Sequence, residues 1–378
     1  MDPKTGTAMN LSYWERKSWL SEVDFTIIGS GIVGLTCALR LREKHPKANI
    51  LVLERGVLPQ GASTKNAGFA CFGSISEILS DLKSHSEEEL LSLVGQRYWG
   101  IQSLRELLGD DNIGYYKYGG HEVFLEKDAD LYEQCLDKLE YINALLRPIF
   151  KQAPFEVSDN RFRFKGIQEN YITHRLEGQI DTGNMMRSLL QIVQTTGIQI
   201  LNATEVEKIE DLGRSVLVSC AHFDFKTNKL LIATNGFANQ LLHEEVQPAR
   251  AQVIITKPIP GLAIKGTFHF DEGYYYFRNI DNRILFGGGR NLDFNMEETM
   301  EFGSTQVVQD KLKDLLQTVI LPHQEVEIDY GWSGIMGVGS QKRPIIKPLS
   351  ENVACGVRLG GMGIAIGTSV GRQLGDLF

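Results

Sequence analysis

One segment near the start of this 378-residue chain restricts the possible folds more than any other. The run Asp24–Ile28 is short, apolar and β-branched, as in a buried strand, and the turn Gly29-Ser-Gly-Ile-Val-Gly34 follows at once. Residues 35–44 have amphipathic helical spacing, and Ile50–Leu53 has the composition of a second buried strand. Strand, glycine turn, helix and strand in this order predict a parallel βαβ unit of the Rossmann type.

The three glycines of this turn suit a dinucleotide pyrophosphate. Such a ligand needs close approach of the backbone, amide donors, and the positive end of a helix dipole. The first glycine permits the tight turn, the second removes a side chain that would block the phosphates, and the third lets helix and strand pack closely. We therefore expect the pyrophosphate to contact Gly29, Gly31, Ile32, Val33 and Gly34.

An acidic residue at the end of the second strand strengthens this prediction. Glu54 lies 20 positions beyond Gly34, where a carboxylate accepts hydrogen bonds from the adenosine ribose, and Arg55 follows it. The alternative is a glycine-rich turn without a ligand in an ordinary α/β protein. Because strand, turn, helix and acid occur together, the pattern favours dinucleotide binding, but it does not separate NAD from FAD.

The loop after this acid resembles a known family. Gly61-Ala-Ser-Thr-Lys-Asn-Ala-Gly68 is similar to the GAS-x-x-N-x-G segment of the D-amino-acid oxidase, glycine oxidase and sarcosine oxidase superfamily, in which it wraps the FAD. Small and hydroxyl-bearing residues suit that role, although a flexible loop has the same composition. The resemblance implies cofactor contacts from Ser63, Thr64, Asn66, Ala67 and Gly68.

Five later segments match the same family in the same order. They are Glu177–Asp181, Thr204–Val206, Ala233–Gly236, Pro248–Gln252 and Gly360–Ile364. The resemblance implies that the Val206 backbone meets adenine. It also implies further contacts with the FAD from Thr234, Gly236, Gly361, Met362, Gly363 and Ile364.

The resemblance also implies a domain organisation. We expect an α/β fold with a discontinuous Rossmann-type FAD-binding domain (residues 20–80, 175–245 and 325–378) and an inserted α+β substrate or cap domain built on an antiparallel sheet (residues 81–174 and 246–324). The closing helix stops so abruptly at Phe378 that we expect the natural chain to continue.

Two motifs look like the γ-glutamylputrescine oxidoreductase branch of the superfamily: Ser12-Tyr-Trp14 and Trp332-Ser-Gly-Ile-Met336. In glycine-oxidase-like members, an arginine at the position of Met336 clamps the substrate carboxylate, and a thioether cannot form such a pair. This puts simple amino-acid specificity in doubt. No cysteine stands in residues 336–340, where sarcosine-oxidase-like members attach their flavin, so we expect non-covalent FAD.

The predicted function is oxidation of a C–N bond in a small amine or amino-acid-like substrate. The flavin takes a hydride from the carbon that bears the amine, and water hydrolyses the resulting imine, so no catalytic acid or base is required. For the substrate wall we expect Tyr274, Tyr276 and Arg278 on one strand face, with Trp332 and Met336 from the strand opposite. Ordinary sheet packing explains the tyrosines equally well.

Three alternatives stay open. The first is an FAD dehydrogenase that passes electrons to an acceptor other than oxygen, because Arg283–Gly287 lacks the oxygen-activating lysine of the sarcosine oxidase branch. The second is a non-catalytic flavin-binding protein. The third is an NAD-dependent dehydrogenase, which leaves residues 61–68 and 360–363 unexplained. The substrate, the electron acceptor and the oligomeric state are not determined by the sequence.

Composition excludes several other classes. The net charge of −8 gives no basic surface for nucleic acid, and no apolar stretch approaches a membrane span or a signal peptide, so we expect a cytoplasmic protein. Five cysteines without a CxxC pair favour reduced thiols, and the eight histidines show no metal-binding spacing. We therefore predict no metal site.

Overall fold

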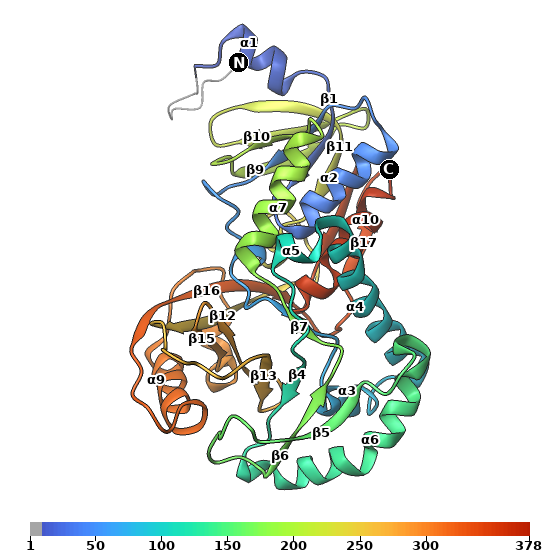
Figure 1. The fold of residues 1–378 in the computed structure, drawn as a ribbon. Helices are drawn as coiled ribbons and strands as arrows, with labels where there is room; N and C mark the ends of the chain where they lie inside the picture. Colours follow the sequence, from blue (N-terminus) through green and yellow to red (C-terminus); the bar gives the residue numbers. More distant parts are fainter. Residues whose placement is uncertain (1–9) are drawn as a thin grey trace. The chain divides into compact units, whose positions relative to one another are not determined.

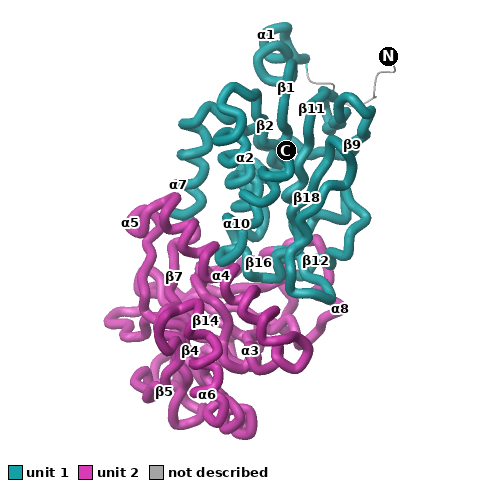
Figure 2. Tube along the Cα trace, turned by 90° about the vertical axis from the view of Figure 1, so that its right-hand side faces the viewer, with its two compact units in different colours: residues 1–65, 183–249, 335–378 teal, residues 66–182, 250–334 magenta. Residues whose placement is uncertain are grey.

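The structure, a computed structural model, is described for residues 10–378, which divide into two compact units (Figure 2). Within the described chain, unit 1 comprises residues 10–65, 183–249 and 335–378, and unit 2 comprises residues 66–182 and 250–334. The two units are defined by how compactly their residues pack, not by what they bind. Which part binds cofactor and which binds substrate stays a prediction. Residues 66–80, 175–182 and 325–334, which we expected in the cofactor domain, belong to unit 2, and residues 246–249, which we expected in the substrate domain, belong to unit 1.

Unit 1 is built on an eight-stranded mixed sheet with the order β17-β18-β11-β1-β2-β8, from which β10 and β9 branch at β11 (Figure 1). The pairs β1–β11, β1–β2, β11–β18 and β2–β8 are parallel. The elements are α1 (Tyr13–Glu15), a π-helical turn (Arg16–Leu20), β1 (Val23–Ile28), α2 (Ile32–Lys44), β2 (Ile50–Leu53), a 3-10 turn (Ala62–Thr64), α7 (Thr182–Thr195), β8 (Gln199–Leu201), β9 (Val206–Asp211), β10 (Val216–Cys220), β11 (Asp224–Ile232), a 3-10 turn (Asn235–Gln240), β17 (Ile345–Pro348), β18 (Val353–Val357) and α10 (Gly363–Gly375).

The strand register brings the carboxyl ends of the parallel strands to one edge of this sheet. Ile28 pairs with Leu53 and with Ile232, and Ile232 pairs with Cys355. The turns that follow β1, β2, β11 and β18 therefore lie along the same edge, where open α/β sheets bind their ligands.

Helices α2 and α10 pack tightly together beside the sheet (Figure 1). Glycines spaced four residues apart make this possible, because positions i and i+4 share one helix face. A Cβ at Gly371 would lie 2.0 Å from Thr36 Oγ1, and a Cβ at Gly367 would lie 2.9 Å from a methyl carbon of Ile32. The first turn of α2, which leaves the glycine turn, is thus fixed by α10.

Unit 2 contains an eight-stranded sheet, β16-β12-β15-β14-β13-β4-β6-β5, and the two-stranded sheet β3–β7. The pairs β12–β15, β15–β14, β14–β13, β4–β6, β6–β5 and β3–β7 are antiparallel, and β13–β4 is parallel. The elements are β3 (Phe69–Ala70), α3 (Ile75–Asp81), α4 (Glu87–Leu108), α5 (Asp110–Ile113), β4 (Gly120–Glu122), a 3-10 turn (Glu126–Asp128), α6 (Ala129–Phe150), β5 (Phe155–Asp159), β6 (Asn170–His174), β7 (Gly178–Gln179), β12 (Gln247–Thr256), β13 (Thr267–Phe270), β14 (Tyr275–Ile280), β15 (Arg283–Gly288), a 3-10 turn (Arg290–Leu292), α8 (Phe294–Glu297), α9 (Gln306–Leu315), a π-helical turn (Leu316–Ile320) and β16 (Ile328–Val338).

The expected fold class is confirmed: an α/β nucleotide-type sheet accompanies a second, mainly antiparallel sheet. Helix α2 begins at Ile32, earlier than the periodicity suggested, because the glycine turn itself supplies its first turn. Strand β11 begins at Asp224, and its polar first half pairs with β10 in an antiparallel hairpin. None of the helices in residues 10–378 is both long and apolar enough to cross a membrane.

Candidate functional site

Neighbouring atoms lie close to each of the three glycines in the turn between β1 and α2. Gly29 has φ +103°, and a Cβ there would lie 2.8 Å from the Ala233 carbonyl oxygen. A Cβ at Gly34 would lie 1.9 Å from the Gly29 carbonyl oxygen, so helix and strand approach as predicted. A Cβ at Gly31 would lie 2.8 Å from Ser63 Oγ. Bare backbone is therefore required at Gly29 and Gly34, and a side chain at Gly31 would displace the Ser63 hydroxyl.

Glu54 fixes the turn from the end of β2. Its side chain is 6% exposed, and Oε2 accepts hydrogen bonds from the Ser30 backbone N–H at 3.2 Å and the Ser30 hydroxyl at 2.7 Å. Oε1 accepts from the Gly56 N–H at 3.0 Å. The Ser30 contact was not foreseen, because nothing in a glycine fingerprint specifies the residue between its first two glycines.

The predicted adenine segment lies beside this carboxylate. The Thr204 N–H donates to the Glu54 carbonyl at 2.8 Å, and Val206, at the start of β9, is 8% exposed. The Arg55 guanidinium lies 3.7 Å from the ring centroid of Phe237, a cation–π contact. Glu54, Arg55 and Val206 thus gather at the carboxyl edge of the sheet in unit 1.

The hydroxyl residues of the next loop lie at the start of α2. Ser63 Oγ accepts the Ile32 N–H at 3.0 Å, which places a polar atom at the positive end of the helix. Thr64 Oγ1 donates to the Pro59 carbonyl at 2.7 Å. A hydrogen bond from this hydroxyl to the cofactor would have to replace that bond within the loop. Ser63 thus lies at the helix end where we predict the phosphates. Thr64 stabilises the loop that contains Ser63.

The turn after β11 meets the turn after β18. Asn235 has φ +45°, and its Oδ1 accepts the Leu359 N–H at 3.1 Å. The Gly360 N–H donates to the Gly337 carbonyl at 2.9 Å, and a Cβ at Gly361 would lie 3.4 Å from Met336 Sδ. Asn235 was missed as a site residue, although asparagine readily adopts this left-handed conformation.

The residues of unit 1 fit an FAD. Three glycine positions leave backbone that a Cβ would obstruct, and the buried Thr234 Oγ1 has no hydrogen-bond partner among residues 10–378. Buried hydroxyls normally find a partner, so this orphaned group marks a place for a polar ligand. Gly236, Met362, Gly363 and Ile364 lie in the same two turns, Ile364 with 6% exposure.

The last residues of the Gly61–Gly68 loop, Asn66 to Gly68, belong to unit 2. Asn66 Oδ1 accepts hydrogen bonds from the Gly68 N–H at 2.9 Å and from Thr182 Oγ1 at 2.9 Å. Ala67 packs in a small apolar cluster with Val253, Ile255 and Leu285. Phe69, Tyr276, Ile280 and Trp332 pack against this cluster.

The expected substrate face is only partly correct. Tyr276 belongs to the Ala67 cluster, whereas Tyr274 precedes β14 and packs against the main core of unit 2, with its ring 5.9 Å from that of Phe294. Alternation assigned them to one face, but β14 begins at Tyr275, so the strand rule does not reach Tyr274. Trp332 and Met336 lie together on one strand, β16, as expected, and in the sheet order β12 and β15 stand between β16 and β14.

Arg358 and His121 both have partners within the protein. Arg358 is 6% exposed and donates to the Arg343 and Glu245 carbonyls, and its Nη1 lies 3.5 Å from Glu245 Oε2. Its charge is therefore already paired. His121 is hydrogen-bonded to Thr173 Oγ1 at 2.8 Å, and burial lowers its pKa to about 3, which suits a structural role.

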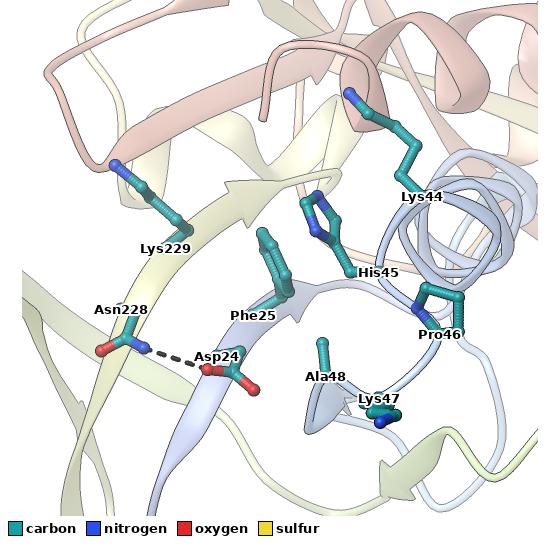
Figure 3. Close-up of a pocket in the computed structure, with 9 residues that line it drawn as sticks. All are labelled: Asp24, Phe25, Lys44, His45, Pro46, Lys47, Ala48, Asn228 and Lys229. Carbon is teal, nitrogen blue, oxygen red and sulfur yellow. Dashed lines mark hydrogen bonds between the residues drawn. The ribbon is translucent and has the colours of Figure 1, made fainter.

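A cavity of about 710 Å³ opens at the opposite edge of the sheet in unit 1 (Figure 3). Asp24 and Phe25, at the start of β1, line it together with Lys44, His45 and Lys229. The Lys229 ammonium already donates to the Glu351 carbonyl and to Asn352 Oδ1, each at 2.9 Å. None of the predicted cofactor residues lines this cavity, so it is separate from the candidate site.

Known proteins resemble the chain over most of its length. It is 23% identical to a probable oxidoreductase, OrdL, of Haemophilus influenzae, and the match covers 94% of this chain and 83% of that protein. Glycine oxidase from Geobacillus kaustophilus superimposes with a TM-score of 0.74 at 18% identity, covering 94% of each chain. L-proline dehydrogenase from P. horikoshii gives a TM-score of 0.73 at 15% identity, covering 94% of this chain and 93% of that one.

These structures establish the likeness of fold. The family model described as DAO, FAD dependent oxidoreductase, matches residues 24–377, which include the glycine turn and the C-terminal turn. The chain therefore belongs to the DAO family of FAD-dependent oxidoreductases, and its cofactor is FAD.

Proposed function

We propose that this FAD-dependent oxidoreductase oxidises a C–N bond of a small amine or amino-acid-like substrate and holds its FAD non-covalently. When bound, FAD supplies the hydride acceptor for the carbon that bears the amine. The residues Gly29 to Gly34, Glu54, Ser63 and Thr234 would hold its dinucleotide part. Asn66, Ala67 and Gly68 would lie against the flavin.

The observation that carries the proposal is the uncharged character of Tyr276, Trp332 and Met336, three of the side chains expected at the substrate. Burial raises the pKa of Tyr276 to about 12, so its phenol stays protonated at neutral pH. Trp332 and Met336 carry no charge. Such groups position and shield an amine without competing for its proton, which suits a reaction that needs orientation and a dry site more than a protein base.

The same residues bear on the substrate class. Met336 stands where glycine-oxidase-like relatives have their carboxylate-binding arginine, and the charge of Arg358 is engaged by Glu245. We therefore propose that the favoured substrates are amines that do not depend on an α-carboxylate. Among the proteins of similar fold, iminodiacetate oxidase and glycine oxidase act, by their names, on amino-acid-like compounds.

A second candidate is an FAD dehydrogenase that uses an acceptor other than oxygen. β15 contains no lysine, and a Cβ at Gly287 would lie 2.7 Å from the Tyr276 ring, so a long side chain has no room there. One protein of similar fold is an L-proline dehydrogenase.

An anaerobic absorbance titration tests these proposals. The purified protein is scanned against amines, N-methyl amino acids and D-amino acids, and air is then admitted. Bleaching of the flavin by an amine supports the proposed reaction, and fast or slow recovery in air separates oxidase from dehydrogenase. A yellow protein that none of these compounds bleaches indicates a non-catalytic flavoprotein. A protein that cannot be loaded with FAD contradicts the whole proposal.

A further inference from the structure

Arg278 is a buried cation in unit 2. It lies on β14 and is 2% exposed, and Nη1 donates to the Ile180 carbonyl at 2.7 Å. Among residues 10–378 its Nε has no hydrogen-bond partner and no carboxylate lies within ion-pair distance, although Asp181 and Asp281 attract its charge from further away. A buried guanidinium without a paired carboxylate is costly, so a chain that keeps one has a use for it.

The guanidinium lies against the loop that we assign to the flavin. Gly68 has φ +75°, and a Cβ there would lie 2.4 Å from the Ile180 carbonyl oxygen and 3.2 Å from Arg278 Nη1. The Ile180 N–H donates back to the Gly68 carbonyl at 2.9 Å. Arg278, Ile180 and Gly68 therefore form one contact, in which the arginine holds the carbonyl against which the glycine packs.

Hydrogen bonds of neighbouring residues connect this contact to the Asn66–Gly68 loop on one side and to β14 on the other. Asn66 Oδ1 ties the loop to Thr182, and β3, which follows Gly68, pairs with β7. From the other side, Gln179 Nε2 donates to the Asn279 carbonyl at 3.3 Å, next to Arg278 on β14. Residues 66–70 are thus linked through residues 178–182 to the central sheet of unit 2, and Arg278 is the charged member of that link.

We propose that Arg278 is a positioning residue for the cofactor: through Ile180 it fixes the Asn66–Gly68 loop in the conformation that receives FAD. This inference rests on the proposed role of that loop. Lysine keeps the charge but loses the planar, rigid fork of donors that bonds Ile180. Methionine keeps the length and loses both the charge and the hydrogen bond. Both the donor geometry and the charge are needed.

The test is FAD binding to the deflavinated full-length protein, followed by the fluorescence of the added FAD. Arg278→Met is expected to raise the FAD dissociation constant about tenfold and to blur the fine structure of the bound flavin spectrum, with Arg278→Lys intermediate. The matched control is Arg283→Met on the adjacent strand, where Nη1 donates to the Thr256 carbonyl. It should change the dissociation constant less than threefold, roughly within ordinary context effects.

Each result decides the inference. If Arg278→Met has the wild-type dissociation constant, or if both methionine variants weaken FAD equally, the positioning role is wrong. If Arg278→Met does not fold, Arg278→Lys decides: weaker FAD binding at an unchanged melting temperature of the FAD-free protein supports the role, and unchanged binding overturns it. Wild-type protein that binds no FAD contradicts the proposed function instead.

Discussion

Glu177 is a buried carboxyl group of unit 2. It is 2% exposed, and Oε1 accepts the N–H groups of Phe72 at 2.6 Å and Gly73 at 3.3 Å. Burial raises its pKa to about 8; Glu77 contributes in the same direction, while those two hydrogen bonds and the Arg97 guanidinium oppose it. Residues 72 and 73 follow the Gly61–Gly68 loop closely in the chain. The charge of Glu177 therefore affects the segment next to the proposed flavin contacts.

Replacing Glu177 by glutamine should flatten the pH dependence of stability. The folded protein keeps this proton up to about pH 8, whereas the unfolded chain loses it near its ordinary value, so wild-type stability falls as the pH rises between the two. From about pH 6.5 to about pH 8, wild type should lose about 1 to 2 kcal/mol more than Glu177→Gln in urea unfolding.

The control for this prediction is Glu169→Gln, an exposed carboxylate close in sequence. Burial lowers the pKa of His121 and His174 to about 3, and in the unfolded chain they titrate at about pH 6.5; their contribution is the same in wild type and both variants, so it cancels from the difference. If Glu177→Gln follows the wild-type curve, Glu177 is already ionised in the folded protein.

At the level of elements, the contact of α10 with α2 holds the phosphate end of the candidate site. Gly371 faces Thr36 and Val33 of α2, and the same helix begins immediately after the turn at Gly360 and Gly361. The packing of one helix pair therefore fixes the glycine turn and the C-terminal turn together. Helices approach this closely only where small residues line the contact.

A methyl group at Gly371 should separate these helices. An alanine Cβ there would lie 2.5 Å from the Val33 carbonyl oxygen, in addition to its contact with Thr36, and overpacking of this kind costs about 1 to 3 kcal/mol. We expect Gly371→Ala to lower the free energy of unfolding by that amount and to weaken FAD binding.

The matched control is Gly363→Ala at the start of the same helix, where an added Cβ meets only a leucine methyl at 3.8 Å. That variant should be neutral or slightly more stable, because alanine favours the helix. Equal loss of stability in both variants would show that the α2–α10 contact is not the cause.

At the level of the whole molecule, the proposed FAD contacts come from separate parts of the chain. In unit 1 they are the turn after β1, the loop after β2, and the turns after β11 and β18, which the parallel register brings to one sheet edge. A ligand that needs all of these segments binds the folded chain and not the unfolded one. FAD binding must then stabilise the fold.

FAD should raise the melting temperature of the deflavinated protein. At 100 times the dissociation constant, binding contributes about 2.7 kcal/mol, or a shift of about 3 to 6 °C. Riboflavin at the same concentration lacks the adenosine diphosphate part and should give a clearly smaller shift in differential scanning calorimetry. If riboflavin stabilises as strongly as FAD, Glu54 and the glycine turn do not bind the cofactor.

The sequence alone was enough to predict the local elements around the cofactor. The bounds of β2 agree with its apolar pattern, and Gly29, Gly34 and the acid at 54 could be assigned because each depends on backbone geometry or on short sequence spacing. A positive φ and a helix start are properties of a few neighbouring residues. Such properties are encoded locally, so a single sequence reveals them.

Contacts between distant segments required the tertiary structure. Ser30 with Glu54, Asn235 with Leu359, and Arg278 with Ile180 join residues 24, 124 and 98 positions apart. The face of Tyr274 likewise depended on where β14 begins. Propensity and periodicity carry no information about which strands pair, because pairing minimises the free energy of the whole chain. The sequence thus determined the family and the position of the glycine turn. Only the tertiary structure decided which side chains hold that turn and the neighbouring loops in place.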